Sequence, residues 1–144
     1  MSNHVKEIHR INYLCSEIDG VYHRASVKMG ISDSVSVILY TLLDAGNECM
    51  LSDIYKLSGT SKQTINSAIR GLEKEGIVYL EQCDGRSKKV VLTQSGQEYV
   101  QQTVARLRLA EIQAYDSWTE EEIHTYITLM EKDLACLNRE IEKM

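Results

Sequence analysis

The sequence predicts a mainly α-helical fold with one small β-hairpin, an α+β class of protein. Apolar residues recur at spacings of three and four along most of the chain, the period of an amphipathic helix. Two short β-rich runs, Ile77–Glu81 and Val90–Thr93, flank one polar turn. A chain of 144 residues suits one domain, residues 1–144, that buries a real core.

Two helices are predicted at the start of the chain. A long helix from His4 to Met29 has a broad apolar face, and Gly30 ends it. Ser32 then caps a second helix that continues to about Ala45. The apolar residues that we expect this second helix to bury are Val35, Ile38, Leu39, Leu42 and Leu43.

A helix-turn-helix is predicted next. A short third helix over residues 51–57 is followed by a glycine-containing turn at residues 58–60 and by a fourth helix that Ser61 caps. The apolar stripe of the fourth helix consists of Ile65, Ala68, Ile69 and Leu72. Its opposite face carries hydrogen-bonding side chains and no acid: Lys62, Gln63, Asn66, Ser67 and Arg70. Gly76 ends the helix.

A basic hairpin follows the fourth helix directly. The segment between its two strands, residues 82–89, contains Arg86, Lys88 and Lys89. A polar-faced helix followed by a basic hairpin is a winged helix-turn-helix arrangement, which binds nucleic acid.

Two more helices complete the chain. Residues 94–115 are predicted as one helix, which residues 116–118 break, and Thr119 with Glu122 forms a capping box for a last helix. The apolar positions of this last helix are Ile123, Tyr126, Ile127, Met130, Leu134, Leu137 and Ile141. The terminal helices carry more apolar surface than a small winged lobe can cover, which predicts a partner. The alternative is a monomeric helical bundle that closes on itself.

At these residues the chain resembles the MarR-type transcription regulators. That family has D-x-R in the wing and then L-T-x-x-G where the next helix starts. The matching residues here are Thr64 and Ile65, Leu72 to Val78, Asp84-Gly85-Arg86, Leu92-Thr93 and Gly96. The flanking helices also lie where the family has them, so the resemblance covers nearly the whole chain. One departure is Ser67, where many members carry a basic residue.

The resemblance implies a homodimer that binds double-stranded DNA. Its long N- and C-terminal dimerisation helices would comprise residues 1–30 and 94–144, and residues 31–93 would form the winged DNA-binding lobe. Two recognition helices about 34 Å apart would meet a pseudo-palindromic site. The mechanism that the resemblance favours is repression, relieved when a small-molecule effector changes the spacing of the two recognition helices.

Residue types suggest roles at such a DNA interface. Gln63 and Asn66 suit adenine edges, and Lys62 suits guanine or phosphate. The hydroxyls of Thr64 and Ser67 are permissive, and Arg86 at the wing tip suits a narrow minor groove. The predicted phosphate contacts are Arg70, Lys88 and Lys89. The alternatives are a solvated helix face and, for Arg86, a pair with Asp84 that holds the wing in shape.

The net charge of −5 is unevenly distributed. Residues 55–93 carry seven basic and four acidic side chains, a local net charge of +3, whereas residues 111–144 carry −6. Phosphates respond to the local field within about 8 Å at physiological salt, so overall acidity does not exclude DNA binding.

Other side chains suggest weaker hypotheses. Tyr13, Tyr22, Tyr40 and Trp118 could line a pocket for an aromatic effector, or could simply be core. Cys15 on the first helix is a candidate redox thiol, against its interpretation as a small buried hydrophobe. The four cysteines are widely spaced, which favours reduced thiols, and the histidines form no metal-ligand spacing.

Several function classes find no support in the sequence. It contains no catalytic motif and no phosphate-binding glycine loop, so we expect neither an enzyme nor a cofactor. No apolar run approaches the roughly 18 residues of a membrane span, and the charged N-terminus does not match a signal peptide. These features predict a cytoplasmic regulator. A thiol-based redox regulator and a winged-helix interaction module without DNA binding stay open as alternatives.

Overall fold

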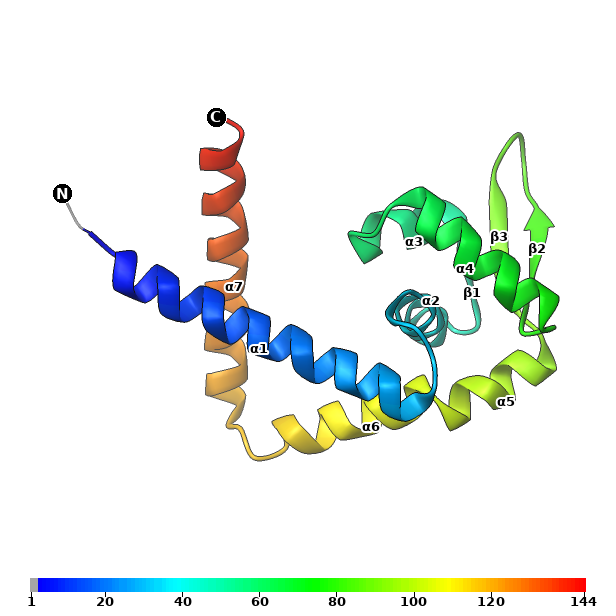
Figure 1. Cartoon of the computed structure of the whole chain (residues 1–144), viewed down its shortest axis with the longest axis horizontal. Coiled ribbons are helices and arrows are strands. Elements are labelled where there is room, and N and C mark those ends of the chain that lie inside the picture. Colours follow the sequence, from blue (N-terminus) through cyan, green and yellow to red (C-terminus); the bar gives the residue numbers. More distant parts are fainter. Residues whose placement is uncertain (1–2) are drawn as a thin grey trace. The chain divides into compact units, whose positions relative to one another are not determined.

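The computed structural model describes residues 3–144, with every side chain except those of residues 57 and 58. The first two residues of the predicted N-terminal segment therefore lie outside the described part. In chain order the elements are α1 (Val5–Met29), α2 (Asp33–Asp44), β1 (Glu48–Met50), α3 (Leu51–Ser58), α4 (Lys62–Lys74), β2 (Val78–Gln82), β3 (Lys88–Leu92), α5 (Gln94–Gln102), α6 (Val104–Tyr115) and α7 (Glu120–Ile141) (Figure 1). The chain divides into two compact units, residues 1–107 and 108–144, which are described separately.

The core of the first unit lies between α2, α4 and the sheet. Ser32 caps α2 as predicted, because its hydroxyl accepts from the Val35 backbone N–H. Ile38, Leu39 and Leu42 of α2 are fully buried. The prediction for α2 is only partly right, since Val35 and Leu43 are half-buried at the edge of this core.

Helix α4 has the predicted caps and the predicted buried stripe. The Ser61 hydroxyl accepts from the Thr64 backbone N–H at 3.2 Å. At the other end Gly76 has a φ of 74°, and the Ile77 N–H donates to the Leu72 carbonyl at 2.9 Å. This reversal needs a left-handed residue, which glycine adopts without strain. The core side of α4 consists of Ile65, Ile69 and Leu72, all buried.

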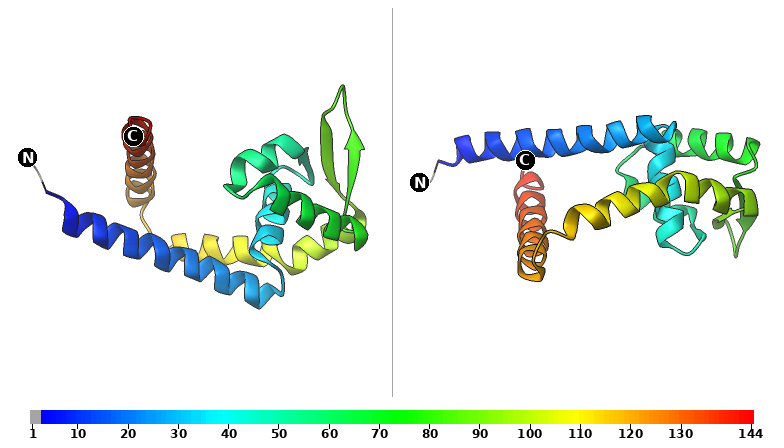
Figure 2. Two further views of the ribbon diagram at one scale, coloured as in Figure 1. Left: turned by 45° about the horizontal axis from the view of Figure 1, so that its top comes forward. Right: turned by 90° about the horizontal axis from the view of Figure 1, so that it is seen from below.

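The hairpin belongs to a three-stranded antiparallel sheet of order β1-β3-β2. The sequence analysis missed β1, because three residues are too few to show a strand pattern and pairing with β3 defines them. Strands β2 and β3 also run closer to the tip than predicted, since Gln82 pairs with Lys88. Figure 2 shows the hairpin as an arm that extends beyond α4.

The predicted single helix over residues 94–115 is wrong, because the chain breaks at Thr103 between α5 and α6. Thr103 has φ −121° and ψ −99°, outside the helical region. Its hydroxyl donates to the Tyr99 carbonyl at 2.8 Å, a back-bond that bends helices. Thr103 is also buried, so this bend is part of the core packing of the first unit.

Helix α1 confirms the predicted long N-terminal helix, and Gly30 ends it with a φ of 72°. Its apolar stripe is exposed over most of its length: Val5, Ile8, Ile11, Leu14, Ile18 and Val21. Among the described residues no single helix is long and apolar enough to cross a membrane, although α1 and α2, bent by 88° at their junction, pass together on length and composition.

The second unit contains α7, whose predicted capping box is present. The Thr119 hydroxyl accepts from the Glu122 N–H at 3.1 Å, and the Glu122 carboxylate accepts from the Thr119 N–H at 2.9 Å. These bonds to the carboxylate lower the pKa of Glu122. No described residue of α7 is buried, and its apolar residues Met130, Leu134 and Leu137 are each more than half exposed.

Candidate nucleic-acid interface

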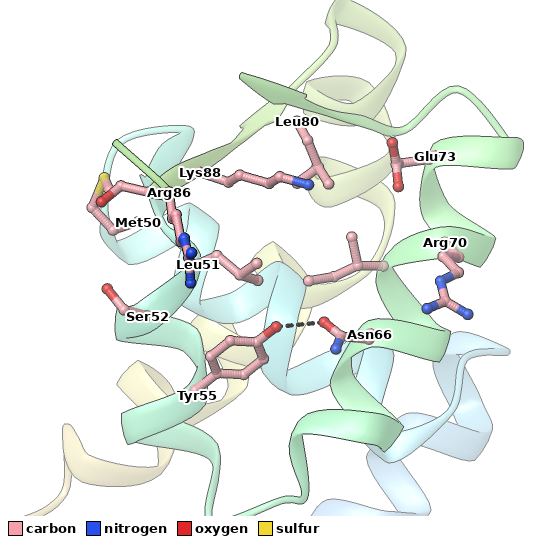
Figure 3. Close-up of a pocket in the computed structure, with 12 residues that line it drawn as sticks. Met50, Leu51, Ser52, Tyr55, Asn66, Arg70, Glu73, Leu80, Arg86 and Lys88 are labelled. Carbon is pink, nitrogen blue, oxygen red and sulfur yellow. Dashed lines mark hydrogen bonds between the residues drawn. The ribbon is translucent and has the colours of Figure 1, made fainter. Parts of the chain in front are cut away.

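A groove of about 730 Å³ lies between α3, α4 and the β2–β3 hairpin. Figure 3 shows side chains from all three elements directed into it. Its lining residues are Met50, Leu51, Ser52, Tyr55, Asn66, Ile69, Arg70, Glu73, Leu80, Arg86, Ser87 and Lys88. The fold therefore brings four of the predicted DNA-contacting residues together in one place: Asn66, Arg70, Arg86 and Lys88.

The charge of this groove is mostly positive. Arg70 reaches it from α4, and Arg86 and Lys88 reach it from the hairpin. Glu73 of α4 is the one carboxylate among the groove residues given above. Because a cleft lined mainly by one sign of charge focuses the local potential, three cations and one anion make this face attractive to phosphate despite the acidic chain.

Asn66 lies on the groove side of α4 and is held by α3. The Tyr55 hydroxyl donates a hydrogen bond to the Asn66 side-chain oxygen. Lys62 places its ammonium 5.3 Å from the centre of the Tyr55 ring, a cation–π distance. Two of the predicted base-contacting residues are therefore ordered by one tyrosine of the preceding helix.

The remaining predicted residues of α4 face solvent. Gln63 and Ser67 are exposed on the outer side of the helix. Thr64 is also exposed, but its hydroxyl lies 2.8 Å from the Ser61 hydroxyl, within the cap of α4. The face that α4 presents is thus polar and free of acids at positions 63, 64 and 67, as the sequence indicates.

The tip of the wing is shaped by backbone geometry and one glutamine. Gly85 has a φ of 67°, and the Gln82 side-chain amide donates to the Gly85 carbonyl at 2.8 Å. The Cys83 N–H closes the turn by donating to the Ser87 carbonyl at 2.9 Å. In the described part of the chain no ion pair joins Arg86 to Asp84, so the alternative role of Arg86 as a partner of Asp84 finds no support.

Lys88 and Lys89 lie on opposite faces of β3. Lys88 points into the groove, whereas Lys89 lies 3.4 Å from the Glu48 carboxylate and 3.8 Å from the Glu81 carboxylate. The charge and the hydrogen bond of Glu48 raise the pKa of Lys89. A phosphate contact by Lys89 would have to replace these two carboxylates.

Sequence reasoning did not include Tyr55 and Glu73 in the site. Both lie on predicted helices, but their place in the groove depends on how α3 and the hairpin approach α4. A helical pattern shows which residues face the core and not which polar residues face a neighbouring element. The available signal for Tyr55 was its amphipathic side chain, whose ring can pack while its hydroxyl finds a partner.

The proposed effector-pocket residues lie in separate environments. Tyr13 and Tyr22 are exposed on α1, and Tyr40 packs partly against the core from α2. Trp118 belongs to the second unit, where its ring centre lies 5.0 Å from that of Tyr115 and 5.5 Å from that of Tyr126. A cavity of about 390 Å³ adjoins Trp118 and is lined by residues of that unit. A shared effector pocket stays a prediction.

The four cysteines are all free thiols. Cys15 is exposed on α1, so its interpretation as a small buried hydrophobe is wrong for the single chain. Burial, helped by the charge of Asp53, raises the pKa of Cys49 to about 11, which disfavours its thiolate. Within residues 3–144 no group of three or more His, Cys, Asp or Glu side chains is placed to hold a metal ion.

Comparison with known proteins agrees with this geometry. The model of the MarR family matches residues 29–87, which span α2, the helix-turn-helix and the wing tip. No curated protein matches the sequence.

Solved structures extend the similarity to nearly the whole chain. A MarR family regulator from Neisseria meningitidis is 16% identical, with a TM-score of 0.82 and 99% of each chain covered. S. aureus MepR, in a complex with DNA, is 21% identical with a TM-score of 0.68, covering 90% of this chain and 96% of that one. PcaV from Streptomyces coelicolor, in complex with its natural ligand, is 14% identical with a TM-score of 0.65, covering 86% and 91%. At these identities the likeness shows a common fold.

Proposed function

We propose that this chain binds double-stranded DNA sequence-specifically as a homodimer. By the match of residues 29–87 and by its fold, the chain is a winged helix-turn-helix regulator of the MarR family. Family membership also confirms the expectation that the chain is not an enzyme. A cytoplasmic location, where genomic DNA is accessible, belongs to the same proposal.

The observation that carries DNA binding is the convergence of cations from two elements on one groove. Arg70 of α4 and Lys88 of β3 both line it, with Arg86 at the hairpin turn. In this proposal α4 enters the major groove with Lys62, Gln63, Thr64, Asn66 and Ser67. Arg86 turns out of the protein groove into the minor groove, and Arg70 and Lys88 meet phosphates. Lys89 contributes less, because Glu48 and Glu81 already neutralise it.

The apolar stripes of α1 and α7 support the homodimer. On α1 the exposed fractions of Ile8, Ile11 and Ile18 are 53%, 50% and 46%, and Leu134 of α7 is 65% exposed. Single exposed apolar residues are common, but continuous stripes on two long helices indicate a surface that a partner covers. A two-fold partner of the same chain would hold the two recognition helices about 34 Å apart.

Control by a small molecule is part of the proposal. PcaV was solved with its natural ligand, and this chain shares its fold. A ligand that binds one spacing of the recognition helices better than the other would shift the dimer between DNA-binding and released states. We propose repression relieved by such a ligand. Because Cys15 is exposed, oxidation of its thiol stays the alternative signal to which the regulator would respond.

Binding of a labelled random duplex, followed by fluorescence anisotropy, tests the core of this function. We expect binding at about 50 mM salt that weakens at least a hundredfold by about 200 mM, as counterion release requires for several phosphate contacts. Selection of bound genomic fragments should then yield a pseudo-palindrome with half-sites one helical turn apart. No duplex binding at low salt would instead support the interaction-module alternative.

A further inference from the structure

Tyr55 forms a connection between α3 and α4 at the floor of the groove. Its hydroxyl donates to the side-chain oxygen of Asn66, eleven residues further along the chain (Figure 3). The Tyr55 ring is half-buried and packs against the hydrophobic core. The hydroxyl therefore sits on a supported ring and holds a polar side chain of the recognition helix.

This hydrogen bond decides which end of the Asn66 amide faces Tyr55. An asparagine side chain has one oxygen that accepts and one NH₂ group that donates. Here the Tyr55 hydroxyl donates to the oxygen, which leaves both N–H donors of the Asn66 amino group for other partners (Figure 3). Without this contact the amide could present either end to a base.

Orientation changes what Asn66 can recognise. An asparagine that reads adenine uses both ends, accepting from the N6 amino group and donating to N7. With its oxygen engaged by Tyr55, Asn66 offers mainly its two N–H donors. The edges that match a donor in the major groove are acceptors: purine N7, guanine O6 and thymine O4.

Lys62 adds a second effect of the same tyrosine. Its ammonium lies 5.3 Å from the centre of the Tyr55 ring, so the ring restrains the first residue of α4. This contact uses the ring face and not the hydroxyl. Removing the hydroxyl alone therefore separates the orientation of Asn66 from the placement of Lys62.

We propose that Tyr55 is a positioning residue for base recognition: by holding the Asn66 oxygen it presents the Asn66 amino group to a hydrogen-bond acceptor on one base edge. This inference rests on the proposed DNA binding and deepens it. The Tyr55 hydroxyl sets sequence preference at one base position and adds nothing to phosphate contact.

The test compares Tyr55→Phe with the wild type on the best duplex selected by the wild type, on its single-base variants and on random duplex. Phenylalanine keeps the ring, its core packing and the Lys62 contact. Tyr79→Phe is a matched control, because Tyr79 is 47% exposed on β2 and does not line the groove. Asn66→Ala and the double variant Tyr55→Phe/Asn66→Ala complete a double-mutant cycle. Thermal melting verifies that each variant is folded.

We expect Tyr55→Phe to lower the ratio of selected to random affinity about fivefold, the usual value of one hydrogen bond. The loss should fall at one base position, while the affinity for random duplex and the salt slope stay at wild-type values. In the Asn66→Ala background the tyrosine change should have no further effect, and Tyr79→Phe should have none.

Two results overturn the inference and can be told apart. If the wild type discriminates among duplexes and Tyr55→Phe keeps the same ratio, or loses affinity equally for all duplexes, the positioning role is wrong and DNA binding stands. If the wild type binds no duplex at all, the proposed function fails, and the positioning role fails with it.

Discussion

The backbone of Gly96 lies directly against the carbonyl group of Ile77, so a β-carbon at position 96 would overlap that oxygen. Beside this contact the Thr93 hydroxyl donates to the Gly76 carbonyl at 2.6 Å and accepts from the Gly96 N–H at 2.9 Å. The L-T-x-x-G motif after the wing therefore joins the start of α5 to the junction of α4 and β2. In this chain the motif fixes the C-terminal end of the recognition helix and the start of the wing to the N-terminal turn of α5.

Gly96→Ala should lower the free energy of unfolding by about 2 kcal/mol, the cost of overpacking a site that can move only by shifting backbone. Gly71→Ala is the matched control, since Gly71 lies inside α4 with nothing within 4 Å of an added β-carbon. That change should stabilise the protein by up to about 1 kcal/mol. Urea denaturation measures both, and equal effects at the two glycines would contradict the packing explanation.

Arg86→Ala should weaken DNA binding several-fold and flatten the preference for A·T-rich flanks. The guanidinium sits at the hairpin turn, on a loop that Gly85 and Gln82 hold in shape without it. The wing should therefore keep its fold when Arg86 is removed. Arg86→Lys, which preserves the charge, should keep most of the affinity for random duplex. A mobility-shift titration with unchanged affinity and flank preference for Arg86→Ala would count against the wing contact.

Lys88→Ala and Lys89→Ala should differ, although the two lysines are neighbours. Lys88 faces the groove, so its loss should weaken binding to all sequences alike and reduce the salt slope by about one. Lys89 lies on the other face between Glu48 and Glu81, so we expect a smaller change in slope. Affinity measured over a series of salt concentrations gives the salt slope of each variant. A larger slope change for Lys89 would mean that it leaves its carboxylates for phosphate.

The sequence predicted the elements that local patterns define. Helix α4 was predicted from Ser61 to Gly76 because both caps are local, and the capping box of α7 was predicted for the same reason. Strand β1 and the break at Thr103 were missed because tertiary contacts define them, namely pairing with β3 and burial of a threonine.

In the candidate site, too, local patterns predicted some features and tertiary contacts defined the others. The polar face of α4 and the basic wing could be predicted because side-chain type and spacing suffice. The partners of Asn66 and Lys89 could not, since Tyr55 and Glu48 reach them from α3 and β1. Cross-element contacts of this kind leave no periodic signal in a single sequence.

Of the two cysteines in residues 31–93, Cys49 should be less reactive than Cys83. Burial raises its pKa to about 11, so at pH 8 only about one molecule in a thousand carries the thiolate, the form that reacts. Alkylation at pH 8 followed by mass spectrometry should label Cys83 of the wing well before Cys49. The rate at Cys49 should rise with pH up to about 11. Labelling of Cys49 as fast as Cys83 at pH 8 would contradict its burial.

Leu134→Glu should convert the proposed dimer to a monomer and abolish tight DNA binding together. Leu134 is 65% exposed in the single chain and lies on the same face of α7 as Met130 and Leu137. A carboxylate there would be desolvated without a partner if a second copy covers this stripe, which costs several kcal/mol. Lys132→Glu on the opposite face is the control and should leave both properties unchanged. Sedimentation velocity gives the oligomeric state, and anisotropy with the selected duplex gives the affinity. If the wild type is a monomer, or if Leu134→Glu stays a dimer with full affinity, α7 does not form the interface. If Leu134→Glu loses both dimerisation and affinity, tight binding needs two joined recognition helices.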